Sequence, residues 1–303
     1  MINRIDVFAH VLPPKFYQTM LKIAPEIPQR FPFINIAALS DMDLRWQHFD
    51  GETKQVISAV NINPEDFTTP TQAADLCRQA NLEISELVDR YPEMFAAGIA
   101  MVPMNNVSAA VEIINGLPDN LVGIQVFTRA LGKSIADPAF APVLAAAAKR
   151  GLLVLLHPVF DSRKPDNNLV FSWEYELSQA MLQLVQAGLF ERWPEIKLIV
   201  HHAGAMVPFF AERITHILSP QQAADFKKFY VDTALLGNAP ALRLTLDYFG
   251  PGHVLFGTDA PFGEAPAGAT RAIIRALAQL KLAPQAQEAI NKANYQRLVA
   301  NIK

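Results

Sequence analysis

The residues of this sequence that could do chemistry are a few histidines and one aspartate, each at the end of a short apolar run. His10 follows IDVFA, His157 ends LLVLLH, and the pair His201 and His202 ends IKLIVHH. Asp259 directly follows HVLFGT. Imidazole and carboxylate groups around one point suit Zn²⁺, Mn²⁺ or Fe²⁺, with a coordination position left for water or substrate. The pattern predicts a catalytic metal site if the fold brings these run ends together.

Each of these residues also has a structural interpretation. His10 could cap a turn, His157 could bond to a loop carbonyl, and Asp259 could form an Asx-turn in GTDAPFG. Side chains alternate along a strand, so we expect His201 to point away from His202 and to be a packing residue on the opposite face. The joint placement at run ends, rather than any single residue, favours the metal site.

Eight short apolar runs are the strands expected to position these residues. They are residues 5–9, 55–62, 95–102, 121–127, 152–157, 196–202, 229–233 and 253–258. Most are continuously apolar, which is typical of parallel strands covered by helices. The stretches between them predict helices at 72–90, 108–115, 138–150, 173–187, 239–249 and 268–281.

This alternation predicts an α/β fold, a single (β/α)₈ TIM barrel whose strands all end at one mouth. An open doubly wound sheet is the alternative, although no GxGxxG follows the first run. We expect one domain spanning residues 1–303. The segments of about 11–43 and 158–172 are too long for plain loops, and we expect them to be rim or lid insertions at the active-site face.

Composition narrows the class of protein. Hydrophobic residues make up 51% of the chain, the net charge is −3, and Cys77 is the one cysteine. A large core is therefore expected, without a disulfide framework or a cysteine-based zinc site. A net negative charge does not indicate a basic surface for binding nucleic acid or a membrane. Without a signal pattern or a run of ~18 apolar residues, we expect a cytoplasmic protein.

Several segments resemble the amidohydrolase superfamily, in particular the amidohydrolase-related branch with aminocarboxymuconate-semialdehyde decarboxylase and the aromatic-acid decarboxylases. The segments are DVFAHVLPP, LLVLLHP, IKLIVHHAGAMVP and VLFGTDAPF. RYPEMFAAGIAMVP and INKANYQRLV resemble the family's third strand and C-terminal helix. The resemblance covers nearly the whole chain and implies the metal-dependent barrel fold of that family.

The resemblance implies a role for each matched position. His10, His157 and Asp259 match ligands of one divalent metal ion, for which we expect Zn²⁺ first and Mn²⁺ as the alternative. His202 matches a histidine that acts near the substrate, and Asp259 matches a residue that also handles a proton. The family's first strand usually reads His-x-His, but this chain has Phe8 at the first of these positions, which we expect to weaken metal binding.

Four residues are candidates for binding the substrate. Arg45 matches a family arginine before the second strand, and a guanidinium can hold a carboxylate through two hydrogen bonds; a solvated helix arginine is the alternative. Arg129 and Arg163 lie in expected loops after the fourth and fifth runs. Phe8 would make the mouth more apolar, which suits a small aromatic or unsaturated acid.

The expected function is a non-oxidative decarboxylase, or carboxy-lyase, acting on a small aromatic or unsaturated carboxylic acid. A metal-dependent hydrolase of a lactone, ester or amide would use the same residues. A third hypothesis is a metal-poor binding protein that has lost its chemistry because Phe8 replaces a ligand. The resemblance also implies a homodimer, and nothing in the sequence indicates a nucleic acid or membrane partner.

Overall fold

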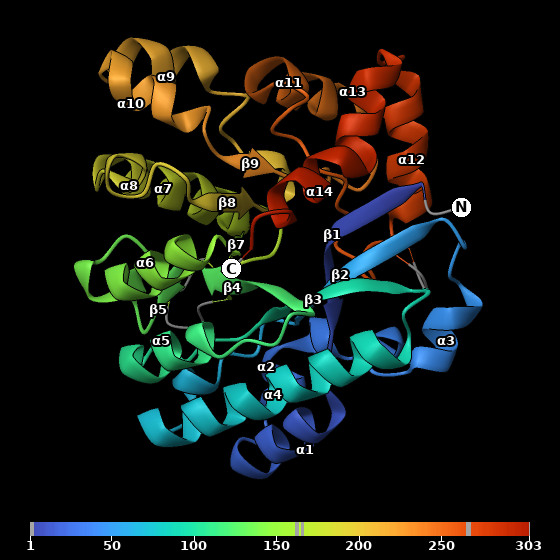
Figure 1. The fold of residues 1–303 in the computed structure, drawn as a ribbon, viewed down its shortest axis with the longest axis vertical. Helices are drawn as coiled ribbons and strands as arrows, with labels where there is room; N and C mark the ends of the chain where they lie inside the picture. Colours follow the sequence, from blue (N-terminus) through green and yellow to red (C-terminus); the bar gives the residue numbers. More distant parts are fainter. Residues whose placement is uncertain (1–2, 161–163, 165–166, 265–267, 303) are drawn as a thin grey trace.

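A curled sheet of seven parallel strands forms the centre of the molecule (Figure 1). The computed structural model describes residues 3–160, 164, 167–264 and 268–302. The strand order is β1 (Arg4–Val11), β2 (Thr53–Ala59), β3 (Phe95–Ala100), β4 (Leu121–Phe127), β7 (Leu153–His157), β8 (Lys197–Val200) and β9 (Tyr230–Val231). An antiparallel hairpin that the sequence did not predict, β5 (Arg129–Ala130) and β6 (Lys133–Ser134), follows β4. The parallel α/β class is therefore confirmed.

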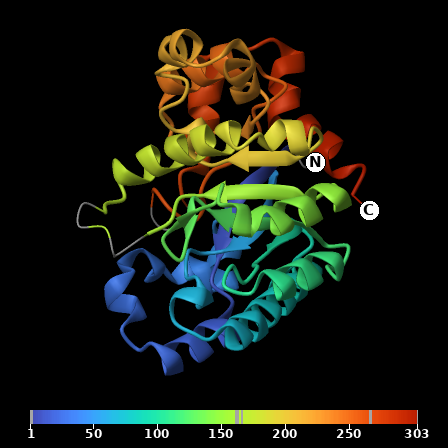
Figure 2. The same ribbon diagram turned by 90° about the vertical axis from the view of Figure 1, so that its left-hand side faces the viewer.

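Helices cover the outside of this sheet (Figures 1 and 2). The main ones are α4 (Pro70–Arg90), α5 (Val107–Asn115), α6 (Ala141–Arg150), α7 (Ser172–Gln186), α11 (Ala239–Phe249), α12 (Thr270–Gln279) and α14 (Asn294–Val299). Shorter ones are α1 (Pro14–Ile23), α2 (Ile27–Arg30), α3 (Met42–Gln47), α8 (Leu189–Arg192), α9 (Ala211–Ile217), α10 (Pro220–Phe226) and α13 (Pro284–Glu288). The six predicted helices are present. In the described part of the chain, no helix has the length and apolarity that crossing a bilayer requires.

Side-chain alternation gives the sheet two apolar faces. One face packs against the helices in the larger core, and the curl of the sheet encloses the smaller core. Leu153 and Leu155 of β7 and Ile199 of β8 belong to the smaller core. Tyr295 and Leu298 of α14 close this core at one end. Side chains two residues apart on a strand point to the same face of the sheet. A residue at a strand end therefore faces the interior of the curl when the residue two positions before it does.

The expected eighth strand, residues 253–258, is not a regular strand, so the prediction of eight regular strands is wrong at this segment. The segment lies between β9 and β1 and bonds to both: Val7 N–H donates to Phe256 O at 2.9 Å, and Val254 forms an isolated bridge to β9. The physical reason is a side chain. The backbone N–H of Thr258 donates to the carboxylate of Asp6 at 3.0 Å, where a strand ladder would use a carbonyl.

The 11–43 insertion is attached to the helices that cover the sheet by a buried carboxylate. Helix α1 begins at Pro14 and has no side-chain cap of its own. Glu83 of α4 accepts the backbone N–H groups of Lys15 and Phe16 at 2.8 and 2.7 Å. These are first-turn donors that a helix leaves without intrahelical partners. Glu83 therefore caps α1 from a neighbouring helix and fixes the insertion beside the sheet.

We predict that Glu83→Ala lowers the free energy of unfolding by about 2–3 kcal/mol, because it removes two hydrogen bonds to a charged acceptor and leaves the buried N–H of Phe16 and the part-buried N–H of Lys15 without this partner. Glu86→Ala, an exposed change on the same helix, should cost less than about 0.5 kcal/mol. Urea unfolding followed by circular dichroism measures both variants. Equal costs for the two variants would contradict the capping role.

Candidate metal centre

Three histidines and one aspartate meet at the carboxyl end of the sheet. His10 lies on β1, His157 ends β7, His201 directly follows β8, and Asp259 follows the 253–258 segment. One ligand atom from each lies within 4.8 Å of the others. The three imidazoles are buried, whereas the Asp259 side chain is 17% exposed. The fold thus brings together the three predicted ligands and adds His201.

The geometry at the centre of this cluster fits a bound cation. The Nε2 atoms of His10 and His201 lie 3.1 and 3.2 Å from Oδ1 of Asp259, yet neither nitrogen makes a hydrogen bond of acceptable geometry. Buried polar atoms without a partner are costly and rare. Ligand atoms that share one ion at bond lengths of about 2.1 Å have separations of this order. The donor set therefore fits a divalent metal ion.

The outer nitrogen of each imidazole is already engaged. His10 Nδ1 lies 3.1 Å from Ser58 Oγ, and His157 Nδ1 donates to the carbonyl of Pro158 at 2.6 Å. His201 Nδ1 donates to the buried carboxylate of Asp232. Metal-binding histidines usually use their second nitrogen in this way, which fixes the ring and the tautomer. The arrangement leaves the three Nε2 atoms for an ion.

Burial and the neighbouring charges set the protonation of the cluster. Burial lowers the pKa of His10 and lowers that of His157 well below its usual range. Burial would also lower the pKa of His201, but the carboxylates of Asp232 and Asp259 outweigh it and raise this pKa to about 10. Burial opposes the ionisation of Asp259, but the imidazoles of His201 and His10 hold its pKa well below the usual value.

His201 corrects an expectation from the sequence. It was expected to pack on the face opposite to His202, but Ile199 faces the enclosed core and His201 continues that face two residues later. His202 comes after the strand has ended, at a positive φ of 53°. Its Nδ1 lies 2.6 Å from Oε1 of Glu174 on α7. His201 therefore belongs to the ligand cluster, and His202 lines the cavity in front of it.

A cavity of about 540 Å³ opens in front of the cluster. Its polar lining consists of Asn61, His157, Glu174, His202 and Asp259. Its apolar lining consists of Phe33, Val60, Leu169, Val170, Trp173, Ala234, Leu235, Leu236 and Phe262. This size and mixture are typical of small-molecule sites, in which an apolar wall holds the ligand and a few polar groups orient it. His157 and Asp259 thus line the same cavity as residues of the two insertions, such as Phe33 and Leu169.

Phe8 lies beneath the cluster rather than in the cavity wall. Its ring is fully buried and stacks on His201 with 3.8 Å between ring centroids. The β1–β2 register shifts between Asp6 and Ala9, and Val7 and Phe8 both belong to the enclosed core. The ring therefore supports a metal-ligand residue from below, and its expected contact with substrate stays a prediction.

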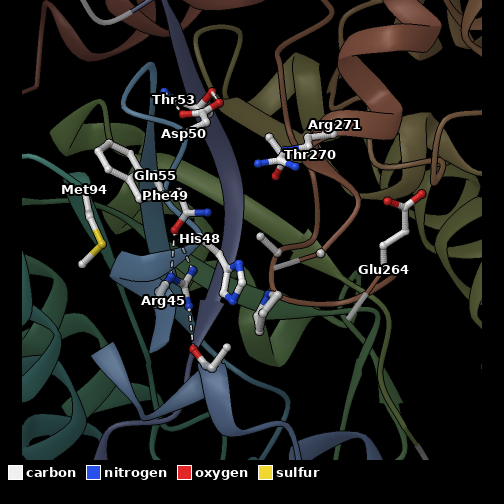
Figure 3. A pocket seen from close by; sticks show the side chains of 14 residues that line it. Arg45, His48, Phe49, Asp50, Thr53, Gln55, Met94, Glu264, Thr270 and Arg271 are labelled. Carbon is white, nitrogen blue, oxygen red and sulfur yellow. Dashed lines mark hydrogen bonds between the residues drawn. The ribbon is translucent and has the colours of Figure 1, made fainter. Parts of the chain in front are cut away.

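Arg45 bonds to the backbone of β1 and does not line the cavity at the metal centre. Its Nη1 donates to the carbonyls of His10 and Ala38 at 2.7 and 3.2 Å, and its Nε and Nη2 donate to Gln55. Figure 3 shows this guanidinium at the edge of a separate cavity of about 320 Å³, with Arg271 across from it. Arg45 thus holds the backbone of a ligand residue, and its expected contact with a substrate carboxylate stays a prediction.

Arg129 does not line the cavity at the metal centre either. It donates from Nε to Oε2 of the buried Glu176 at 2.8 Å. Arg163 lies outside the described residues. Substrate contacts of both side chains stay predictions.

Comparison with known proteins agrees with this geometry. The amidohydrolase family model matches residues 56–299, so the chain belongs to that family. It is 26% identical over 281 residues to a 6-methylsalicylic acid decarboxylase of Penicillium expansum, covering 85% of each chain. It is 28% identical over 242 residues to a 2-amino-3-carboxymuconate-6-semialdehyde decarboxylase of Dictyostelium discoideum, covering 73% of this chain and 67% of the relative. The resemblance inferred from the motifs is thereby confirmed.

Solved structures show the same fold. A dihydroxybenzoic acid decarboxylase from Polaromonas sp. JS666, solved with bound manganese and 2-nitroresorcinol, superposes with a TM-score of 0.80 at 20% identity. The match covers 99% of this chain and 97% of that one.

We predict that His157→Ala lowers the metal content at least about tenfold after loading with zinc or manganese and desalting, because it removes one of the ligands. His216→Ala on the exposed surface of α9 is the matched control and should keep the content of the unmodified protein. Mass spectrometry of the elements measures both. Equally high metal in His157→Ala would place the ion elsewhere.

We also predict that metal affinity rises with pH between about 6 and 8. The raised pKa of His201, about 10, keeps a proton on its ring throughout this window when no ion is bound. The ion must displace that proton, so one proton leaves per ion and the apparent Kd falls about tenfold per pH unit. Titration calorimetry in buffers of different ionisation enthalpy measures both quantities. A Kd that is constant across the window would contradict this protonation state.

Proposed function

We propose that this protein is a metal-dependent, non-oxidative decarboxylase of a small aromatic or unsaturated carboxylic acid. One observation carries the proposal: three buried imidazoles and Asp259 converge at one end of a cavity whose remaining wall is mostly apolar. The names of the relatives, which include decarboxylases of 6-methylsalicylic acid and of a carboxymuconate semialdehyde, support the reaction class. A homodimer and a closed (β/α)₈ barrel of the family type belong to the same proposal.

The metal belongs to this proposal as well. Three imidazole nitrogens and one carboxylate oxygen suit Zn²⁺, which we propose first, and equally suit Mn²⁺. The manganese in the Polaromonas structure supports the second choice. When bound, a divalent ion supplies positive charge that holds an anionic substrate and stabilises the charge that develops during the reaction.

The cavity wall accounts for the ring of the substrate. Phe33, from the 11–43 insertion, lies 6.0 Å from Trp173 between ring centroids, and both line the cavity. Leu236 lies on the same wall. A flat, unsaturated body would bury its apolar faces against these side chains while its carboxylate points to the imidazole end.

The reaction itself needs one proton and releases one molecule of CO₂. The bond between the carboxyl carbon and the ring or chain carbon breaks, CO₂ leaves, and the bonding electron pair stays on the carbon. A proton must then reach that carbon, which gives R–COO⁻ + H⁺ → R–H + CO₂. His202 and Asp259 both line the cavity, and we propose that they hold and deliver this proton, as general acids do.

We predict that the metal-loaded protein releases CO₂ from at least one member of a panel of aromatic and dienoic acids. Asp259→Asn should lower the rate per bound metal about 10²–10⁴-fold, the usual contribution of a general acid–base group. His216→Ala is the control and should retain the rate. A coupled CO₂ assay together with product chromatography provides the measurement.

The same panel should contain lactones, esters and amides, because these substrates separate the hypotheses. Turnover of a lactone without CO₂ from any acid would reject the decarboxylase in favour of a hydrolase. Little bound metal after loading, together with no turnover of any compound, would favour the metal-poor binding protein.

A further inference from the structure

Two consecutive histidines at the metal centre are held by two carboxylates from different elements. His201 donates from Nδ1 to Asp232, which lies directly after β9 and is fully buried. His202 pairs through Nδ1 with Glu174 of α7, at 2.6 Å. The Asp232 carboxylate also accepts the backbone N–H of Ala203 at 2.9 Å. The first histidine belongs to the ligand cluster, but the second does not.

The turn that contains His202 is stabilised by hydrogen bonds from helix α7. His202, Ala203 and Ala205 have φ values of 53°, 56° and 55°, in the left-handed region that costs energy for residues with a side chain. Helix α7 holds this turn at two points: Glu174 bonds the ring of His202, and Ser178 Oγ accepts the backbone N–H of Met206 at 3.0 Å. Helix α7 therefore fixes the orientation of the His202 imidazole.

The pair sits at the cavity rather than on the outer surface. Glu174 and His202 both line the cavity that contains Asp259, and their side chains are 27% and 12% exposed. The Trp173 ring lies 6.4 Å from the His202 ring in a stacked arrangement. Since Nδ1 bonds to Glu174, Nε2 is the ring nitrogen left for a ligand in the cavity.

We propose that Glu174 is a positioning residue, which fixes the ring of His202 and keeps Nδ1 protonated, so that Nε2 is the nitrogen that takes up the proton and delivers it in the cavity. The expected effect of Glu174 on kcat rests on the proposed decarboxylase function. Its expected effect on the ring orientation and tautomer of His202 does not. A carboxylate that accepts Nδ1–H orients an imidazole and selects its tautomer in the same way in the Ser-His-Asp triad. Glu174 itself neither binds the metal nor transfers the proton to carbon.

The first test does not depend on activity. Nitrogen-15 NMR of zinc-loaded protein reports which ring nitrogen of each histidine carries the proton, and His202→Asn assigns the resonance. We expect Nδ1–H in the unmodified protein and loss of that preference in Glu174→Ala. Glu212→Ala, which breaks an exposed Glu–His pair on α9, should leave the His202 signal unchanged. An unaltered His202 signal in Glu174→Ala would overturn the proposal.

The second test measures catalysis on the acid that gives CO₂. Glu174→Ala should lower kcat about ten- to a hundredfold, with KM changed less than about threefold and the metal content unchanged. Glu174→Asp should recover part of the loss. In a His202→Asn background, Glu174→Ala should have no further effect, because the two residues act as a unit. Additive losses, or a loss of metal, would overturn the positioning role.

These two tests distinguish failure of the inference from failure of the proposed function. If no acid gives CO₂ but the tautomer changes in Glu174→Ala, the decarboxylase proposal fails and the positioning role stands. If CO₂ is released but neither the tautomer nor kcat responds to Glu174→Ala, the decarboxylase proposal stands and the positioning role fails.

Discussion

Side-chain alternation along buried parallel strands is the constraint on which the site depends. Leu155 and Ile199 face the enclosed core, so His157 and His201, two residues further on, must face the same interior. Burial there disfavours the charged imidazole, and it holds the pKa of His157 well below its usual range. A neutral imidazole keeps the lone pair that a metal ion needs. The fold thus provides both the position and the protonation state of this ligand.

His201 differs because carboxylates lie on both sides of its ring. Asp232 accepts Nδ1–H, and Oδ1 of Asp259 lies 3.2 Å from Nε2. Without an ion, the two negative charges favour an imidazolium, which explains the raised pKa. A divalent ion held by His201 and Asp259 would replace that proton and supply the positive charge instead. The same buried acids that stabilise the protonated ring would therefore stabilise the metal, so a positive charge faces the two carboxylates in either case.

The sequence predicted the parts of the site that follow from strand ends. His10, His157 and Asp259 were found because each ends an apolar run, and the parallel class followed from the same runs. His201 was missed because run boundaries do not give the phase of alternation; Ile199 reveals it only once the enclosed core is known. The pairing of Glu174 with His202 spans 28 residues and depends on how α7 packs, which no local pattern encodes. The irregular eighth segment likewise depends on a side-chain bond to Asp6, which is more than 250 residues away.

The two insertions contribute apolar rings to the cavity region, whereas the strand ends contribute the ligand atoms. Phe33 of the first insertion contacts Phe160 of the second and Trp173 directly after the second, at centroid distances of 5.8 and 6.0 Å. These rings join the insertions into one apolar wall, but they add no ligand atom to the cluster. In the proposed function, chemistry is therefore placed on strand ends that the sheet holds rigidly, and recognition of the substrate ring on loop segments, which in general tolerate change in sequence. If the proposed function holds, a change in this wall would alter which acid fits while the ligands stay in place, because Phe33 reaches the cavity from an element that contributes nothing to the sheet.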